Sequence, residues 1–399
     1  MHKNKHIWII NEVAGAPAYG MGFRHYYLAK QFVKQGYDVT IISSSYSHLF
    51  KAYPSVKKEK IDEIDYHWIN TINYNNAHNN KRVLQWFIFT FKIFFLPFIL
   101  KKPDVIIASP MVQFSVFPAW LIAKLYKAKL IYEVRDIWPL SLIEIGKVRK
   151  NHPFVKLIAL FEKFSINKSD LIVSNLQNYN KHMEGNLNSN KSFKWVSNGI
   201  DLDEQNNKLA LPNMIKEKLP KDKFIIGYTG TVGFSNSLDT FCESAKLLSK
   251  QEDICFVIVG DGQEKENLKK EYGYLNNLIF IDSIQKREVP SILELFDACY
   301  IGLKKENLFK YGVSPNKLFD YMYSSKPILY AIESGKSIVD ISNCGISIEA
   351  QSPKAIVEGV KKLYAMPKEE REILGSNGKE YILEHFTYEK LAKEYIECF

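Results

Sequence analysis

The chain has 399 residues and is 46% hydrophobic, which is enough for two domains that each bury a core. Its five cysteines form no CxxC pair, so the composition favours a reducing compartment over a disulfide framework or a cysteine-based zinc site. Residues 1–200 hold 27 Lys+Arg against 13 Asp+Glu, although the whole chain is only +9. This excess indicates an anionic partner. Since the chain shows no nucleic-acid motif, a membrane surface or a phosphorylated substrate is the better match.

The first half of the chain alternates strand-like and helix-like segments. The apolar part of its first segment is too short for a signal peptide and reads as a strand, so we expect a cytoplasmic protein. A helical period follows over 23–36. Short apolar runs rich in β-branched residues predict strands at 6–10, 37–43, 104–109, 129–134 and 170–174. Such alternation predicts an α/β domain with a parallel sheet covered by helices.

The alternation starts again in the second half. Strands are predicted at 224–230, 255–262, 278–283, 298–303 and 326–332. The polar stretch 198–223 is interpreted as a linker between two Rossmann-like domains. We therefore expect a first domain over 1–200, a second over 201–379, and a helical tail over 380–399 that packs back on the first. Ligands of such sheets bind beyond the carboxyl ends of the strands, so the expected site is a cleft between the two facing domains.

Three glycine-bearing turns stand between a predicted strand and a predicted helix. Gly20 and Gly22 precede the helix at 23, Gly230 and Gly233 follow the strand at 224, and Gly260 follows the strand at 255. Glycine lets the backbone approach a ligand closely, and a helix N-terminus offers free N–H groups to an anion. Each turn alone is equally compatible with an ordinary loop. Two in the second domain favour a nucleotide site there.

The stretch SPNKLFDYM (314–322) predicts a helix that starts at Pro315 and is capped by Ser314. Lys317 and Asp320 then lie three residues apart on one face. A helix N-terminus with a lysine suits a diphosphate, and a carboxylate one turn later can bind ribose hydroxyls. The alternative is an ordinary surface pair of opposite charges.

The stretch YEVRDIWPL (132–140) ends a predicted buried strand in charged side chains, Glu133, Arg135 and Asp136. At the carboxyl end of a parallel strand these side chains would project into the expected cleft. A guanidinium there could stabilise a developing negative charge without titrating. Glu133 and Asp136 could hold Arg135 in place, or one of them could help accept a proton. The alternative is a structural salt bridge that ends the strand.

The apolar segment 81–102 carries basic residues at both ends. As a helix its apolar part would span roughly 25 Å, short of a bilayer core of about 30 Å. Lys92 and Trp86 within it, with Lys101 and Lys102 at its end, instead suit a helix lying in a membrane interface. The alternative is a helix buried between the sheet and its neighbours.

Several of these stretches together resemble the family-four retaining glycosyltransferases of the GT-B fold, in the branch that builds bacterial cell-surface polysaccharides. The matching motifs cover most of the chain in the family's order, and they are RHYYLA (24–29), PDVIIAS (103–109), YEVRDIWPLS (132–141), SNGID (197–201), GYTGTVG (227–233), VIVGDG (257–262) and SPNKLFDYM (314–322).

The resemblance implies roles for the two domains and for single residues. The second domain would hold the nucleotide of a sugar donor and the first would receive the acceptor. Asp320 matches the ribose-binding acid, and Lys317, with Ser314 and Asn316, would lie at the phosphates. Arg135 and Asp136 fall where many relatives carry a His–Asp pair.

The chain also departs from the family's pattern. Gly312 stands where the first acid of a two-acid signature is expected. The stretch FSNSLDTF (234–241) lacks an Arg-and-Lys pair that many relatives aim at the diphosphate, a duty that Arg135 and Lys317, or Arg24, would take over.

The sequence thus predicts a retaining glycosyltransferase, peripheral on the cytoplasmic membrane. It would move an N-acetylated hexosamine or deoxyhexosamine from a UDP-sugar to a lipid-linked saccharide, and it would need no metal. Two rivals remain: a UDP-sugar 2-epimerase of the same fold, and a catalytically silent scaffold that binds nucleotide-sugar or membrane.

Overall fold

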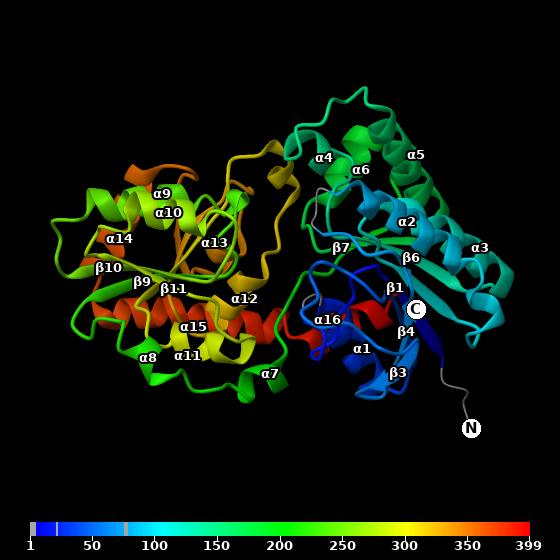
Figure 1. Cartoon of the computed structure of the whole chain (residues 1–399), viewed down its shortest axis with the longest axis horizontal. Helices are drawn as coiled ribbons and strands as arrows, with labels where there is room; N and C mark the ends of the chain where they lie inside the picture. The colour runs from blue at the N-terminus through cyan, green and yellow to red at the C-terminus, as the bar shows by residue number, and fades with distance from the viewer. Residues whose placement is uncertain (1–4, 21–22, 76–78) are drawn as a thin grey trace. The chain divides into compact units, whose positions relative to one another are not determined.

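The computed structural model describes residues 5–20, 23–75 and 79–399, and the chain folds into two compact units (Figure 1). Unit 1 comprises Met1–Ser197, Tyr311–Val313 and Tyr388–Phe399. Unit 2 comprises Asn198–Lys310 and Ser314–Thr387. Each unit has its own sheet and its own buried core. The fold is of the expected α/β class with two Rossmann-like domains.

Unit 1 is built on an eight-stranded sheet of order β3-β4-β2-β1-β5-β6-β7-β8. Every neighbouring pair is parallel except β3 and β4. Its strands are β1 (His6–Ile10), β2 (Asp38–Ser44), β3 (Lys58–Ile61), β4 (Ile64–Ile69), β5 (Val105–Ala108), β6 (Lys129–Val134), β7 (Leu171–Ser174) and β8 (Phe193–Trp195).

Helices cover the sheet of unit 1. Apolar side chains from α2 and α3, such as Phe89 and Ile122, pack with Trp8 of β1 in one buried cluster. The last helix, α16, packs on α1, where the rings of Phe32 and Tyr395 meet edge to face at 6.0 Å. The helices are α1 (Arg24–Lys34), α2 (Asn80–Ile93), η1 (Leu96–Phe98), η2 (Gln113–Ser115), α3 (Val116–Tyr126), α4 (Leu140–Glu144), α5 (Pro153–Lys168), α6 (Tyr179–Leu187) and α16 (Tyr388–Ile396).

Unit 2 is built on a six-stranded, wholly parallel sheet of order β11-β10-β9-β12-β13-β14. Its strands are β9 (Phe224–Thr229), β10 (Ile254–Val259), β11 (Leu278–Ile281), β12 (Ala298–Gly302), β13 (Ile328–Ala331) and β14 (Gly345–Ser347). Its helices are α7 (Leu202–Asn206), α8 (Asn213–Lys216), η3 (Phe234–Asn236), α9 (Leu238–Leu247), α10 (Lys265–Tyr272), η4 (Lys286–Glu288), α11 (Val289–Leu293), α12 (Asn316–Tyr323), α13 (Ile338–Ser342), α14 (Pro353–Ala365) and α15 (Lys368–His385).

The structure moves two of the expected boundaries. The stretch 198–223 is not a linker, because it contains α7 and α8 and belongs to unit 2. The tail that packs on unit 1 begins at Tyr388 and not at residue 380, since α15 continues to His385 within unit 2. Among the described helices, none combines the length and the apolar character that a membrane crossing needs.

Candidate functional site

Two glycine turns of unit 2 lie against each other where β9 and β10 end. Gly230 N donates to Val259 O at 2.9 Å, and Val232 N donates to Asp261 O at the same distance. At Gly260, where φ is +146°, a Cβ would lie 1.9 Å from Gly230 O, so only glycine fits. Gly233 has no such constraint, because a Cβ added there would lie 3.6 Å from the nearest atom, Cγ2 of Thr231. The contact brings the two backbone turns together at one edge of the sheet.

Lys317 of α12 lies over these turns. A Cβ at Gly230 would be 3.1 Å from the Lys317 Nζ, so the missing side chain makes room for the ammonium. Nζ donates to Tyr228 Oη and, at 3.1 Å, to Asn236 Oδ1, and it lies 4.0 Å from the centroid of the Tyr228 ring. In the part of the chain that the structure describes, no carboxylate pairs with it. Burial lowers the pKa of Lys317 to about 7.

The helix that carries Lys317 begins differently from expectation. α12 starts at Asn316 with Pro315 at its N-cap position, so Pro315 does not occupy the first turn. Ser314 does not cap it, because no side chain donates or accepts a cap bond there. The Ser314 hydroxyl instead accepts from Asn198 N at 3.0 Å, and Asn198 Nδ2 donates to Ser314 O at 2.6 Å. Ser314 therefore ties the SNGID stretch to the start of α12, and Asn316 is exposed at the helix N-terminus.

Asp320 lies one turn along the same helix as Lys317 and is already paired. Lys286 Nζ of η4 donates to its two carboxylate oxygens at 2.8 and 2.7 Å, and Gln205 Nε2 donates weakly at 3.4 Å. The Asp320 side chain is 14% exposed. Sequence reasoning missed Lys286 because nothing in its local pattern links it to a helix 34 residues away.

Two further side chains that sequence reasoning missed surround the Gly233 turn. Asn236 Oδ1 accepts a hydrogen bond from Lys317 Nζ, and Asn236 Nδ2 donates to Thr231 O at 3.0 Å. Lys304, two residues after β12, has its Nζ 3.0 Å from the centroid of the Phe234 ring. The signal for Lys304 was available, since it directly follows a predicted strand whose carboxyl end lies at this edge.

Glu133 in unit 1 belongs to a sealed cluster and not to an open site. Its side chain is 0% exposed. Arg24 Nε donates to Glu133 Oε1 at 3.0 Å, Tyr395 Oη donates to the same oxygen, and His25 Nε2 lies 3.1 Å from Oε2. Burial alone would raise the pKa of Glu133, but Arg24 outweighs it and holds that pKa well below the usual range. The prediction that Glu133 acts directly on a substrate is therefore wrong, because its buried side chain cannot contact one.

Arg24 likewise has a structural position. Besides Glu133, its guanidinium donates to Ser197 O and, at 2.7 Å, to Val196 O. Burial opposes the charge, yet the adjacent Glu133 carboxylate raises the pKa of Arg24 above its ordinary value. The Arg24–Glu133 pair therefore connects α1 and β6 with the two residues that follow β8.

Arg135 and Asp136 follow Glu133 and differ from it. Arg135 is half-buried, and its Nε has no hydrogen-bond partner among the residues that the structure describes. Asp136 is exposed, and it accepts from Ile137 N at 2.8 Å, from Trp138 Nε1 at 3.1 Å and from the Ser141 hydroxyl. Asp136 thus orders the turn before α4, while Arg135 keeps an unused donor at the carboxyl end of β6.

Glycines expected near the site have separate outcomes. Gly20 has a φ of +82°, and a Cβ there would be 3.1 Å from the Lys51 side chain. Backbone conformation and packing therefore explain the glycine at this position. Gly22 lies outside the described residues. Gly312 belongs to unit 1, has a φ of +103°, and would place a Cβ 2.6 Å from Gln177 N. No acidic side chain could stand at Gly312 without moving that backbone.

The residues expected at a membrane divide in two. Trp86 is wrong as an interface residue, because it is buried and packs with the rings of Trp138 and Phe154. Lys92 is exposed, with its Nζ donating to Asn70 O at 2.7 Å. Lys101 is exposed and paired with Asp38, and Lys102 is exposed beside it. Across the described chain, no group of three or more His, Cys, Asp or Glu side chains is arranged to hold a metal.

Comparison with known proteins agrees with this two-part architecture. Residues 19–204 match the family described as Glycosyltransferase Family 4, and residues 212–381 match Glycosyl transferases group 1. An uncharacterised glycosyltransferase of Methanocaldococcus jannaschii is 27% identical over 323 residues, covering 78% of this chain and 79% of the relative. The putative colanic acid biosynthesis glycosyl transferase WcaI of Escherichia coli K12 is 24% identical, covering 67% of this chain and 68% of the relative.

A solved structure extends the likeness to the whole fold. Anabaena Alr3699/HepE, crystallised in complex with UDP, is 12% identical with a TM-score of 0.68, and the match covers 98% of this chain and 99% of that one. Taken together, the two family matches span most of the residues that form units 1 and 2. The chain thus has the GT-B fold, and it is similar to glycosyltransferases, with a part that matches Glycosyltransferase Family 4 followed by a part that matches Glycosyl transferases group 1.

Proposed function

We propose that this glycosyltransferase moves a sugar from a UDP-sugar to a lipid-linked saccharide in the synthesis of a surface polysaccharide. Lys317 carries the donor assignment. Its ammonium lies at two glycine turns, its hydrogen-bond partners are neutral, and burial lowers its pKa, so an anion would complete its coordination. HepE, a structural relative, was crystallised with UDP, which supports this donor class.

The chemistry would depend on stabilising the departing nucleotide. Breaking the bond between the sugar and the diphosphate leaves negative charge on the β-phosphate, and a cation placed there in advance lowers the barrier. We propose Lys317 and Arg135 as such cations, because neither donates a hydrogen bond to a carboxylate among the described residues. Asp320 would bind ribose hydroxyls with the lone pairs that Lys286 leaves unused. We propose retention of the anomeric configuration and no metal.

The acceptor is inferred from a relative and from the surface of the first half of the chain. A relative is described as a putative colanic acid biosynthesis enzyme, which favours a saccharide acceptor at a cell surface. The basic first half of the chain and its exposed apolar side chains favour an acceptor on a lipid and work at the inner face of the cytoplasmic membrane. The donor sugar would be an N-acetylated hexosamine or deoxyhexosamine.

A donor panel tests the proposal. Purified protein is mixed with UDP-, GDP- and dTDP-sugars, with and without a lipid-linked saccharide extract, and nucleotide release is measured. Release that requires one UDP-sugar and the extract is expected. Release without acceptor, with an epimerised sugar, would indicate the epimerase instead, and release from GDP- or dTDP-sugars alone would overturn the UDP assignment.

A substitution links the reaction to the site. Lys317→Met should weaken UDP binding in calorimetry about 30- to 150-fold, because a charge-assisted hydrogen bond to phosphate contributes roughly 2–3 kcal/mol. Lys270→Met, which removes an exposed lysine of α10 in the same unit, is the matched control and should bind UDP like the unmodified protein. Equal UDP affinity of the two variants would contradict the role of Lys317.

A further inference from the structure

A second lysine contacts η3, the short helix that also accepts a hydrogen bond from Lys317. Lys304 follows β12, which is a parallel neighbour of β9, so it lies at the same carboxyl edge of the sheet as the Gly230 turn. The backbone N of Lys304 donates to Ser235 O at 3.0 Å, which holds the chain after β12 against η3. Its Nζ lies 3.0 Å from the centroid of the Phe234 ring. Two lysines from different elements therefore contact one three-residue helix.

The ammonium of Lys304 is not neutralised by a carboxylate in the described structure. Among the residues that the structure describes, Lys304 forms no ion pair, and its Nζ faces the ring of Phe234. The neighbouring Lys305 differs, because its Nζ lies 2.7 Å from a Glu349 oxygen and 3.0 Å from a Glu333 oxygen. A lysine Nζ has three N–H donors, and the ring face takes one of them. The chain thus neutralises Lys305 and leaves Lys304 with donors for an anion.

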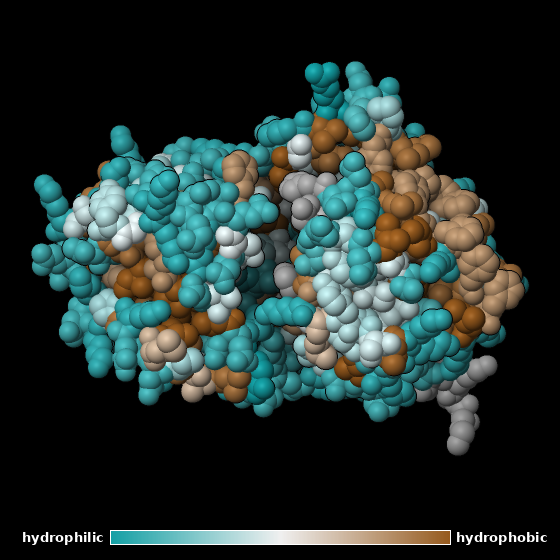
Figure 2. Space-filling model, viewed as in Figure 1, coloured by the Kyte–Doolittle hydropathy of each residue, from teal (hydrophilic) through white to brown (hydrophobic). Residues whose placement is uncertain are grey.

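Phe234 is exposed, although it does not belong to the apolar surface of unit 1. Exposed apolar side chains gather over the side of unit 1 that α3 and α5 form (Figure 2). Phe234 lies in unit 2 and is 63% exposed, so core packing does not explain it. An aromatic face attracts an ammonium electrostatically, and this contact gives the ring a role at the surface. Phe234 therefore holds the Lys304 ammonium in position.

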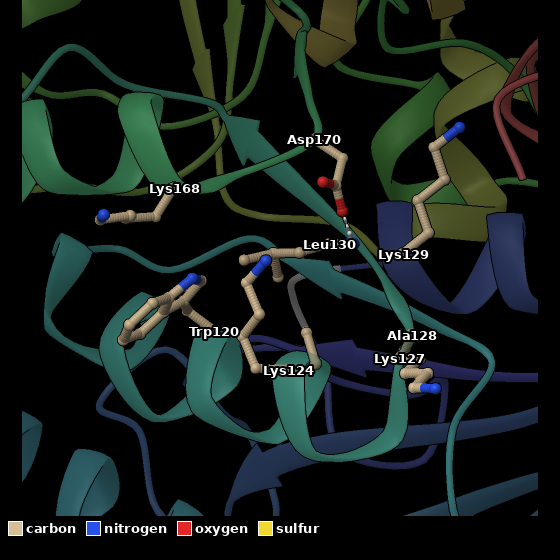
Figure 3. Close-up of a pocket in the computed structure, with 9 residues that line it drawn as sticks. Trp120, Lys124, Lys127, Ala128, Lys129, Leu130, Lys168 and Asp170 are labelled. Atoms are coloured by element: carbon tan, nitrogen blue, oxygen red, sulfur yellow. Dashed lines mark hydrogen bonds between the residues drawn. The ribbon is translucent and has the colours of Figure 1, made fainter.

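Lysines at another sheet edge have a structural explanation that Lys304 lacks. A pocket at the amino-terminal edge of the sheet in unit 1 is lined by Lys124 and Lys168, and Figure 3 shows both beside Trp120. Lys124 lies in the last turn of α3 and Lys168 in the last turn of α5. A positive charge there offsets the partial negative charge of a helix C-terminus. Because Lys304 follows a strand, this explanation does not apply to it.

The contacts place the polar groups of the candidate donor site in a series. Asp320 and Lys317 lie three residues apart on α12, with Lys317 nearer the start of the helix. Lys317 Nζ donates to Asn236 Oδ1 at 3.1 Å, and Asn236 shares η3 with Phe234, which contacts Lys304. A nucleoside diphosphate has a similar series of a ribose, an inner phosphate and an outer phosphate. With the ribose at Asp320 and the diphosphate starting at Lys317, the outer phosphate would lie toward Lys304.

We propose that Lys304 binds the outer phosphate of the nucleotide donor beside Lys317, and that the ring of Phe234 positions its ammonium. This inference rests on the proposed function and adds a second cation of unit 2 to it. The stretch 234–241 contains no Arg or Lys of its own, so β12 supplies the charge that this stretch lacks. Negative charge develops on the outer phosphate when the donor sugar departs, and a preorganised ammonium stabilises it.

Calorimetry of the full chain with UDP and with UMP tests the proposal. Lys304→Met should weaken UDP binding about tenfold and leave UMP binding within about twofold, because the lost charge-assisted hydrogen bond is to the outer phosphate. The matched control is Lys305→Met, which removes the same charge from the next residue and should bind UDP like the unmodified protein. Equal UDP affinities of the two variants would overturn the proposal. An equal loss of UMP and UDP affinity in Lys304→Met would also overturn it.

Two further variants test the charge and the ring separately. Lys304→Arg keeps a cation that can stack on the ring and bind phosphate, so UDP affinity should stay within about threefold. Phe234→Leu should weaken UDP binding about threefold in the unmodified protein and should have no effect in Lys304→Met, because the ring acts through the lysine. An equal loss in both backgrounds would overturn the positioning role of Phe234.

The results also separate this inference from the donor proposal. If Lys317→Met loses UDP affinity while Lys304→Met does not, the donor site remains supported and the second cation is wrong. If the unmodified protein binds no UDP, the donor proposal fails and this inference fails with it.

Discussion

Glu133 in unit 1 and Lys317 in unit 2 are both charged side chains at the carboxyl edge of a parallel sheet, but their surroundings differ. Glu133 is fully buried, and its carboxylate forms an ion pair with Arg24 and accepts a hydrogen bond from the Tyr395 hydroxyl. Lys317 has only neutral partners in the described chain, and burial lowers its pKa. A charge that the protein itself neutralises stabilises the fold, whereas a desolvated charge without a counter-ion is prepared for a ligand. The two can be distinguished by experiment.

The largest effect is expected on stability from Glu133→Gln. The substitution leaves the Arg24 guanidinium buried without its carboxylate, which should cost about 3–5 kcal/mol of unfolding free energy. Urea unfolding followed by circular dichroism measures it, with Glu184→Gln on the exposed side of α6 as the control. The folded fraction should still bind UDP normally. A midpoint equal to that of the control would show that the pair does not stabilise the fold.

A backbone change should come next. Gly260→Ala would place a Cβ against Gly230 O at a φ that alanine avoids, with a strain of about 1–3 kcal/mol. We expect the two turns to move apart and UDP affinity to fall at least tenfold in calorimetry. Gly233→Ala is the control, since a Cβ there has room. If both variants bind UDP equally, the contact between the turns does not shape the donor site.

A second buried acid in unit 1 sharpens the contrast with Glu133. Glu12 accepts from Met111 N at 2.9 Å, but its Oε1 has no hydrogen-bond partner in the described chain, and burial raises its pKa to about 7. Folding therefore favours the protonated acid, so this contribution is present at low pH and is lost as the pH rises through about 7. For Glu133, whose pKa is lowered, the contribution is present at neutral pH and lost as the pH falls.

Glu12→Gln should remove the first of these effects. At pH 8 the variant should be more stable than the unmodified protein by about 3 kcal/mol, and near pH 4, below the pKa of the unfolded chain, the advantage should vanish. Urea unfolding at the two pH values measures the difference. A constant difference between the variant and the unmodified protein at both pH values would contradict the raised pKa.

The smallest effect is the pH dependence of nucleotide binding. Because the pKa of Lys317 is lowered to about 7, the cation is mostly present at pH 6 and mostly absent at pH 8. UDP affinity should therefore fall about tenfold over this range, beyond any change due to the nucleotide itself. Calorimetry on Lys317→Met gives the nucleotide's own dependence. Identical profiles for the two proteins would show that Lys317 does not titrate in binding.

Much of the fold could be predicted because its signals are local. All ten strands expected from apolar runs exist in the described structure. The expected set lacked β3, β4, β8 and β14. β3 has the sequence KEKI and lies at the edge of its sheet, with side chains of alternating exposure. β8 and β14 are only three residues long. None of these three strands carries a continuous apolar run. Edge strands are defined by their neighbours more than by their own sequence.

The arrangement of the candidate site could be predicted where its residues share one helix, and not where it depends on the tertiary fold. Lys317 and Asp320 lie on one short helix, so their proximity follows from helical spacing. The pairs Arg24–Glu133 and Lys286–Asp320 join residues far apart in sequence, so no local sequence pattern predicts them. The YEVRD motif therefore looked like one functional cluster, although β6 directs Glu133 into the core and leaves Arg135 with a free donor.

The return of the chain to unit 1 at α16 has a consequence for biosynthesis. Tyr395, which donates to Glu133, is made only after the whole of unit 2 has been translated. The unit that is synthesised first is therefore completed last, and until then one partner of the enclosed carboxylate is missing. The same discontinuity governs domain exchange with relatives: a chimera that replaces only residues before 198 would pair a foreign sheet with the original closing helix, so α16 must be exchanged together with the domain that it completes.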